Sequence, residues 1–340
     1  MIESLRRGES DAGGNPRMVS AKREEALQDD WLETLEKAGR PLADTSDTWR
    51  HNAINLACLA LLIIGFPAAY LAFRNLPTPL MVPLLGLVYG SFIFSFFTLV
   101  VHEASHNMFL ITGSPRLRRR LNDIGGWAIC MLFLRDYGLH WRKGHLLHHR
   151  RTLEEDDPQN CSKYVLEGRA LLVKLAKVWL IPFYEFEVYR LWMKDLNDRC
   201  PKPEGSSAPG WLRGAGFVLG WTAILIFPLS QAPIATLLTT LIAIKAATCL
   251  NFLKSSMEHG GGYREISDQR LKTRGLTFPL MGLCFPFCIT PYHWEHHLVP
   301  AIPWYRLPHF RKMIADRIPE DQREWIYTPG PELLRQVILP

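Results

Sequence analysis

Residues 80–106 read LMVPLLGLVYGSFIFSFFTLVVHEASH. The first part of this stretch, from Leu80 to Val101, contains no charged side chain. A helix that crosses a membrane needs about 20 predominantly apolar residues, and this run has that length. His102 and His106 follow directly and are four positions apart, so on a continuing helix their imidazoles lie on one face. The stretch therefore predicts a membrane helix that presents two imidazoles at its end.

Three other long apolar runs have the same character. Ala53 to Phe73 precedes the first stretch, and Gly214 to Leu229 is followed closely by Ile234 to Leu253. Short connections join the runs in pairs, which predicts two helical hairpins. We expect four transmembrane helices, at about 53–73, 80–101, 214–229 and 234–253. A soluble protein with buried core hairpins is the alternative, and two such hairpins in one chain disfavour it.

The distribution of Lys and Arg predicts the side of the membrane that each segment occupies. Basic residues are plentiful in the N-terminal tail, in 116–213 and in the C-terminal segment, whereas the hairpin tips carry only Arg74. By the positive-inside rule, we expect both termini and the middle segment in the cytoplasm. The first fifty residues contain no apolar stretch after a basic start, so we expect no cleaved signal peptide. The formal net charge of +6 fits an anionic lipid surface better than nucleic acid.

These observations predict an all-α integral membrane protein with a helical cytoplasmic cap. The expected parts are an N-terminal segment (1–50), a membrane domain (51–310) whose cap comprises 102–213 and 254–310, and a C-terminal tail (311–340). Three shorter apolar stretches, 124–134, 170–183 and 276–289, are expected to lie at the bilayer surface or to enter the bilayer without crossing it. The seven cysteines form no regular framework, so we expect them to be reduced.

Eight of the twelve histidines fall into three clusters with helical spacing. The clusters are His102/His106, His145/His148/His149 and His293/His296/His297. Imidazole is a good ligand for iron, copper, zinc and nickel, and three such clusters exceed what packing requires. Two membrane hairpins would bring all three clusters out on the same side. The sequence therefore predicts a metal site at the cytoplasmic surface.

The first cluster also satisfies the pattern HExxH, which is typical of zinc proteases. In that chemistry, two histidines bind one zinc and Glu103 activates a water molecule. Eight clustered imidazoles exceed the needs of one tetrahedral zinc and suit two metal ions of higher coordination number. Ligand type alone does not choose iron over zinc or copper. A zinc protease and a membrane protein that stores or senses metal therefore remain open at this point.

The motifs HEASH, HLLHH and HWEHH, in this order, resemble the three histidine boxes of the membrane fatty acid desaturase and hydroxylase superfamily. Their flanks, HLLHHRRTLEEDDP and HHLVPAIPWYRLP, are also similar, and the similarity extends from about Val101 to Leu307. The resemblance implies two non-haem iron ions on the cytosolic side, with O₂ as co-substrate, that oxidise an unactivated C–H bond of a lipid-like substrate. Fatty acyl desaturation is the expected reaction. Hydroxylation and alkene-forming decarboxylation are alternatives on the same scaffold.

The resemblance also implies the metal ligands. Family members commonly add a ligand just after the fourth membrane helix, and His259 in SSMEHGG stands at that place. No catalytic residue is implied beyond the ligands themselves. The expected ligands are His102, His106, His145, His148, His149, His259, His293, His296 and His297.

Other polar residues near the boxes are candidates for supporting roles. His140 precedes His145 by five positions, so on a continuous helix at about 100° per residue it points away from the cluster and is expected not to bind metal. Carboxylates commonly fix the tautomer of a ligating imidazole. The carboxylates beside the boxes are Glu103, Asp157, Glu258 and Glu295.

Lys245 lies inside the fourth apolar run, about two turns from its cytoplasmic end. An ionisable residue at that depth indicates a function, such as binding a substrate carboxylate or polar head group. Snorkelling of the side chain toward the interface is the alternative, and we slightly favour it.

The chain carries no recognisable electron-transfer module of its own. We find no HPGG segment, no four-cysteine rubredoxin pattern and no nucleotide-binding GxGxxG after a strand. Electrons are therefore expected from a separate ferredoxin, rubredoxin or cytochrome b5. Basic residues near the first two boxes would suit an acidic donor: Arg116, Arg118, Arg119, Arg120, Arg142, Lys143, Arg150 and Arg151.

Overall fold

A computed structural model of the protein describes residues 31–159, 165–199, 209–263, 266–277 and 290–338. Within these ranges the chain forms helices and no strand. The long helices are α2 (Thr48–Phe73), α3 (Thr78–Phe96), α9 (Gly210–Gln231) and α10 (Pro233–His259). A π-helical segment, η2 (Phe97–His102), and α4 (Glu103–Ser105) continue α3.

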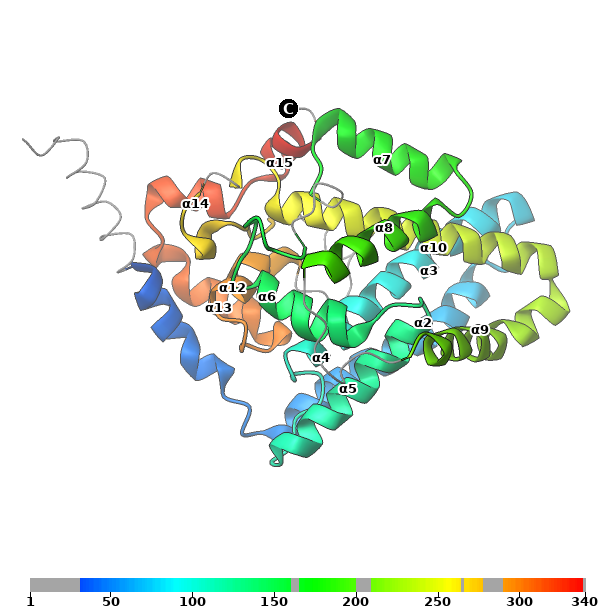
Figure 1. The fold of residues 1–340 in the computed structure, drawn as a ribbon, viewed down its shortest axis with the longest axis horizontal. Helices are drawn as coiled ribbons and strands as arrows, with labels where there is room; N and C mark the ends of the chain where they lie inside the picture. Colours follow the sequence, from blue (N-terminus) through cyan, green and yellow to red (C-terminus); the bar gives the residue numbers. More distant parts are fainter. Residues whose placement is uncertain (1–30, 160–164, 200–208, 264–265, 278–289, 339–340) are drawn as a thin grey trace, which may run out of the picture.

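Shorter helices connect and cover the long ones. They are α5 (Pro115–Met131), the π-helix η3 (Tyr137–His145), α6 (Leu146–His148), α7 (Gly168–Leu180), α8 (Tyr184–Arg199), α12 (His293–Leu298), α13 (Leu307–Ile314), α14 (Glu320–Ile326) and α15 (Gly330–Val337). Figure 1 shows α12, α13 and α14 at one end of the molecule, whereas α9 and the start of α10 lie at the opposite end.

Four helices of the described chain have the length and composition to cross a membrane. They are Thr48–Phe73, Thr78–Ser105, Gly210–Gln231 and Pro233–His259. Large apolar side chains on them are exposed, and Leu219 and Phe227 of α9 reach 70% and 72%. Continuous exposed apolar faces of this extent are stable when lipid covers them. The four expected apolar runs are therefore four candidate membrane spans, and each helix extends beyond the apolar run seen in the sequence.

The closest helix contact within the membrane part joins α3 to α10. A Cβ atom on Gly86 would lie 2.6 Å from a methyl carbon of Ile242, and one on Gly90 would lie 2.5 Å from the Cβ of Ala246. This GxxxG spacing allows two helix backbones to approach closely. Because both contacts advance in the same direction along the chain, α3 and α10 run parallel. The sequence-adjacent helices α2 and α3 also contact each other, as do α9 and α10.

The shorter apolar stretches occupy different places. The segment 124–134 forms the second half of α5 and the turn after it, whereas 170–183 forms most of α7 and the connection to α8. α7 packs against α10, and its outer face and the following turn expose apolar side chains, including Leu180 and Phe183. Of the stretch 276–289, all but the first two residues lie outside the described residues. Contact of these stretches with the bilayer surface stays a prediction.

A hydrophobic core packs around α12, the helix that carries the third histidine cluster, and holds it in place. Trp294, between His293 and Glu295 in α12, is fully buried with Leu307, Phe310 and Ile314 of α13. Leu32 and Leu35, near the N-terminal end of the described chain, belong to the same core. Burial of this apolar surface stabilises the position of α12. Segments before residue 50 and after residue 310 therefore pack around the site.

Candidate metal centre

The packing of α3 against α10 places His102 and His259 at the same height along the two helices. His102 follows Gly90 by twelve residues, and His259 follows Ala246 by thirteen, so both lie about 18–20 Å beyond the Gly90–Ala246 contact. The second cluster arrives on η3 and α6, and the third arrives on α12. All three clusters and His259 therefore meet at the same end of the parallel pair.

Nine histidines form two adjacent groups. Within each group, one ring nitrogen of every member lies within 4.8 Å of those of the others. The five-histidine group contains His102, His106, His145, His149 and His296, and the four-histidine group contains His148, His259, His293 and His297. All nine expected ligands are present, and no other histidine that the structure describes joins either group.

The division between the groups follows from helical geometry. On a helix, residue i+4 lies about 40° from residue i, whereas residue i+3 lies about 60° away in the other direction. His145 and His149 accordingly share one group, while His148 belongs to the other. His293 and His297 likewise share the four-histidine group, whereas His296 belongs to the five-histidine group. Each HxxHH box therefore contributes to both groups.

The spacing of the ring nitrogens fits metal binding. The Nε2 atom of His145 lies 3.1 Å from the Nε2 atoms of both His106 and His149. The Nε2 atoms of His293 and His259 are 3.0 Å apart. Neighbouring corners of an octahedral shell with metal–nitrogen bonds of about 2.1 Å are separated by about 3.0 Å. The observed separations therefore match ligands that share an ion.

Several rings have their Nδ1 atoms bound to protein oxygens. Nδ1 of His148 lies 2.8 Å from Oδ2 of Asp157, and Nδ1 of His259 lies 3.1 Å from the carbonyl oxygen of Lys272. An imidazole that donates from Nδ1 carries its lone pair on Nε2, the atom that faces the other histidines. This arrangement prepares Nε2 to bind a metal ion.

Four ring nitrogens of the nine histidines have no hydrogen-bond partner in the described structure, and two of them are Nε2 atoms. Nε2 of His102 and Nε2 of His297 are buried and unpaired. An unsatisfied buried polar atom costs about 1–3 kcal/mol, so a protein gains by giving such atoms a ligand. The residues present therefore fit a pair of bound metal ions.

Burial favours the neutral form of several of these imidazoles, and the neutral form is the one that binds metal. Burial lowers the pKa of His106 to about 3, with a smaller contribution from the charge of Arg142. Burial also lowers the pKa values of His145, His149, His296 and His297 well below their ordinary value, and neighbouring histidines lower them further. Neutral rings at physiological pH offer free lone pairs without losing a proton.

Three of the four expected supporting carboxylates touch a histidine of the centre. Oε1 of Glu103 lies 3.2 Å from Nδ1 of His102, and Asp157 holds His148. Oε2 of Glu258 lies 3.3 Å from Nε2 of His293 and also pairs with Lys254. All three carboxylates are buried.

Glu295 has a different role. Its carboxylate accepts hydrogen bonds from Arg311, at 3.0 Å from Nη2, and from the Tyr327 hydroxyl at 2.9 Å. Among the described residues, its carboxylate forms no hydrogen bond or ion pair with any of the nine histidines. Its interaction with Arg311 and Tyr327 instead joins α12 to the C-terminal helices. Its place inside the third box gave no signal of this structural role.

His140 belongs to neither group, but the expected reason was wrong. The sequence argument assumed an α-helix from His140 to His145, whereas the structure has a π-helix, η3. In a π-helix the backbone bonds connect residues five apart, which places such residues on the same face. His140 therefore lies beside His145 on the wall of a cavity, with its ring stacked on Trp141 at 4.9 Å.

Lys245 is buried and bound by protein groups. Its Nζ atom lies 2.5 Å from the carbonyl oxygen of Val178, 3.1 Å from that of Ile181 and 2.9 Å from Oε1 of Glu185. These partners account for the buried charge without a substrate and without snorkelling. Lys245 connects α10 to the end of α7 and the beginning of α8.

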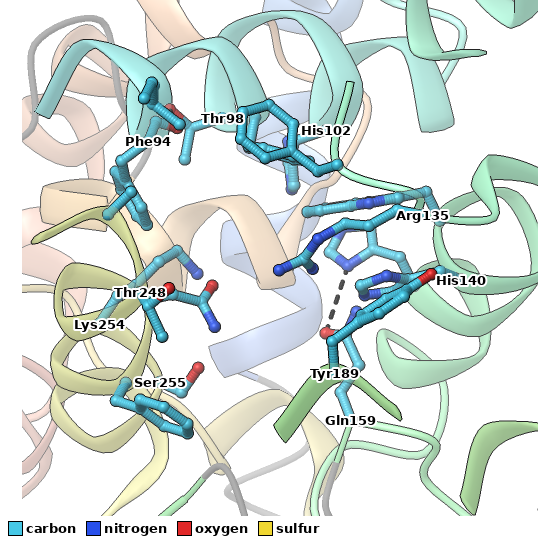
Figure 2. Close-up of a pocket in the computed structure, with 18 of the residues that line it drawn as sticks. Phe94, Thr98, His102, Arg135, His140, Gln159, Tyr189, Thr248, Lys254 and Ser255 are labelled. Atoms are coloured by element: carbon cyan, nitrogen blue, oxygen red, sulfur yellow. Dashed lines mark hydrogen bonds between the residues drawn. The ribbon is translucent and has the colours of Figure 1, made fainter. Parts of the chain in front are cut away.

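A cavity of about 150 Å³ adjoins the histidines. Figure 2 shows Phe94, Thr98 and His102 along the top of the cavity and Arg135, His140 and Tyr189 on its right side. Thr248, Lys254 and Ser255 of α10 complete it. Apart from His102 and His140, sequence reasoning missed these lining residues. The signal was a polar series, Thr248, Asn251 and Ser255, at helical spacing in an apolar run.

Comparison with known proteins identifies the type of centre. A model of the fatty acid desaturase family matches residues 77–329, which include all nine histidines. The chain belongs to the fatty acid desaturase family. The resemblance of the three boxes is thereby confirmed. As a member of this family, the chain is a membrane oxidoreductase of the di-iron type, and the zinc protease and metal-storage interpretations are not supported.

Two curated relatives are ketolases. A beta-carotene ketolase of Paracoccus sp. strain PC1 is 25% identical over 221 residues, which cover 63% of this chain and 73% of the ketolase. A beta-carotene ketolase of Paracoccus sp. strain N81106 is 24% identical over 220 residues, which cover 63% and 72%. Both relatives belong to the same membrane di-iron superfamily, in agreement with the family assignment.

Proposed function

We propose that the nine histidines bind two iron ions on the cytosolic side of a membrane and that the protein oxidises a fatty acyl chain with O₂. The observation that carries this proposal is the pair of histidine groups at the end of two parallel membrane helices. A methylene C–H bond has no acidic proton and no leaving group, so a side-chain base cannot cleave it. The bound irons would supply the oxidising chemistry that side chains lack.

The protein's own residues prepare the site for that chemistry. Asp157, the Lys272 carbonyl and Thr152 hold Nδ1 atoms of His148, His259 and His297, respectively. These contacts fix the orientation of the rings, so that the ligands need little rearrangement. The adjoining cavity would hold the chain beside the histidines and exclude water from the reacting carbon.

Desaturation is the reaction that we propose first. The substrate loses two hydrogens from neighbouring carbons, and O₂, two electrons and two protons complete the formation of two water molecules. The electrons come from a separate reduced carrier, such as a ferredoxin, rubredoxin or cytochrome b5. Of the basic residues near the first two boxes, Arg116, Arg119, Arg120, Arg150 and Arg151 are exposed and could attract an acidic carrier. Arg142 instead bonds Asp123.

Oxygen insertion is the second candidate. The matched relatives are named beta-carotene ketolases, and that name describes a product that gains oxygen. Both reactions begin with the same C–H cleavage. They differ in whether a second hydrogen then leaves the neighbouring carbon or the first carbon gains oxygen.

Metal and product analysis test the proposal together. The purified protein should contain about two irons per chain, and cells that express it should accumulate an oxidised lipid. Mass spectrometry separates loss of two hydrogens from gain of oxygen or loss of carbon dioxide. The His296→Ala variant should form no product. Protein that binds only zinc, or a product that persists in the His296→Ala variant, would refute the proposal.

A further inference from the structure

The side chains of α3 and α10 that line the cavity change from polar to apolar with distance from the histidines. On α10 the lining residues run from Ser255 and Asn251 near His259 to Ala247 and Ile244 farther away. Ile244 precedes His259 by fifteen residues, a rise of about 22 Å along the helix. The cavity is therefore elongated, and its two ends differ in chemistry.

The parallel helix α3 shows the same gradient. Its lining residues run from Ile93 and Phe94 to Thr98 and then to His102 at the histidines. Because α3 and α10 run parallel, their polar ends coincide and so do their apolar ends. The lining residues of both helices therefore change from polar to apolar in the same direction, and the polar end lies at the metal centre.

The polar end offers unused hydrogen-bonding groups. The Asn251 carboxamide and the Ser255 hydroxyl line the cavity and have no hydrogen-bond partner in the part of the chain that the structure describes. Polar side chains on a membrane helix that face a cavity mark the path of a substrate. Asn251 follows Thr248 by three residues and Ser255 follows Asn251 by four, so the three side chains lie on one face of α10.

A cation lies on the facing wall. Figure 2 shows Arg135 opposite Thr248 and Lys254, and its guanidinium carbon is 5.1 Å from the ring centre of Phe97 and 5.4 Å from that of Tyr189. Lys254 pairs with Glu258. Glu185, which also lines the cavity, pairs with Lys245. Arg135 therefore places a positively charged group on the wall opposite Thr248 and Lys254 of α10.

We propose that the substrate is a free fatty acid that binds with its carboxylate at this polar end, held by Asn251, Ser255 and Arg135. The hydrocarbon chain then extends along α3 and α10 toward Ile93 and Ile244. This inference rests on the proposed function, because it specifies which carbon the oxidation reaches. A chain held this way presents its carboxyl-proximal carbons to the metal centre, and its middle and methyl end lie away from it.

The position of oxidation tests the orientation. Protein with its full iron content is incubated with a reduced ferredoxin, O₂ and hexadecanoic acid, and mass spectrometry locates the modified carbon. The change should fall in the half of the chain next to the carboxyl group. Oxidation at the middle or in the methyl half would overturn the orientation and leave the proposed function intact. No oxidation of any lipid by the iron-loaded protein would count against the proposed function.

Binding tests the head-group contacts without turnover. Radiolabelled hexadecanoic acid and hexadecane are equilibrated with the detergent-solubilised protein. Asn251→Leu, which keeps a similar volume, should weaken binding of the acid at least tenfold, the effect of one lost hydrogen bond to a charged group, and should leave hexadecane unchanged. Ser255→Ala should act in the same direction.

A matched control separates this effect from damage to the helix. Thr240→Val removes a hydroxyl from the same helix, where it bonds only the carbonyl oxygen of Thr236, outside the cavity. This variant should bind both lipids as the wild type does. If Asn251→Leu loses metal, Ser255→Ala decides the test. Unchanged acid binding in a metal-loaded variant at either position, or equal weakening for acid and hexadecane, would overturn the proposal.

Discussion

Gly90 of α3 lies against Ala246 of α10 so closely that a Cβ atom on Gly90 would come within 2.5 Å of the Ala246 Cβ. The two helices run parallel, and the contact sets the level of His102 relative to His259. These two histidines belong to different groups. The relative position of the two proposed metal ions therefore depends on a contact between membrane helices about 18 Å away.

Gly90→Val should abolish metal binding. The new side chain would collide with the backbone of α10, because a Cβ atom on Gly90 already lies 2.8 Å from the carbonyl oxygen of Ala243. Overpacking of this kind costs about 1–3 kcal/mol and shifts the backbones. Iron content and thermal unfolding measure the effect. Gly214→Val in α9, where no atom lies within 4 Å, is the matched control. Normal iron content in Gly90→Val would contradict the argument.

His297→Ala should remove one metal ion preferentially. His297 belongs to the four-histidine group, so three ligands would remain there, whereas the five-histidine group stays complete. The metal content should fall from about two ions per chain to about one, and oxidation should be lost. His309→Ala, on an exposed part of α13, should change neither quantity. Loss of both ions would show that the groups bind metal as one unit.

Asp157→Asn should weaken metal binding while the protein stays folded. The carboxylate accepts from Nδ1 of His148 at 2.8 Å and fixes the tautomer that presents Nε2. Loss of such a contact typically lowers metal affinity roughly 10- to 100-fold. Competition with a chelator measures the change. Asp156→Asn, at an exposed neighbour that pairs with Arg151, should have no effect, and equal effects of both variants would argue against a role for Asp157.

Lys245→Met should destabilise the protein without selecting against free acids. Removing the ammonium leaves Glu185 buried without its partner, which typically costs about 3–5 kcal/mol. The double variant Lys245→Met/Glu185→Gln should recover part of that loss. Thermal unfolding and assays with free and esterified acids provide the measurement. A stable single variant that loses only the use of free acids would instead support a head-group role.

Cysteine labelling should place the metal end of the molecule in the cytoplasm. In a background without other cysteines, Asp156→Cys and Asp321→Cys should react with a membrane-impermeant reagent from the cytoplasmic side. Gln231→Cys, at the other end of the long helices, should react from the opposite side. All three positions are exposed. Labelling of Asp156→Cys and Asp321→Cys from different sides would break the proposed topology.

The amino-acid sequence predicted the chemistry of the site because its signals are local. A long apolar run marks a possible membrane helix by its length and composition, and the four runs appear as four long helices. Histidines at i, i+3 and i+4 share a helix face whatever the fold around them. All nine predicted ligands accordingly meet in the structure, including His259, which lies outside the boxes.

Features that depend on the neighbours of a residue were decided only by the tertiary structure. The π-helical geometry of η3 places His140 on the cavity wall, and Lys245 forms an ion pair with Glu185 of another helix. Glu295, although it stands in the third box, bonds Arg311 and Tyr327. Short-range periodicity carries no information about such long-range partners.

The division of the nine histidines into groups of five and four combines both kinds of information. Within each HxxHH box, helical angles separate His148 from His145 and His149 and separate His296 from its neighbours. Which other histidines join each of these subsets depends on the positions of α3, α10 and α12 relative to one another. That placement results from contacts such as Gly90 with Ala246, which join residues far apart in the chain, and only folding brings them together.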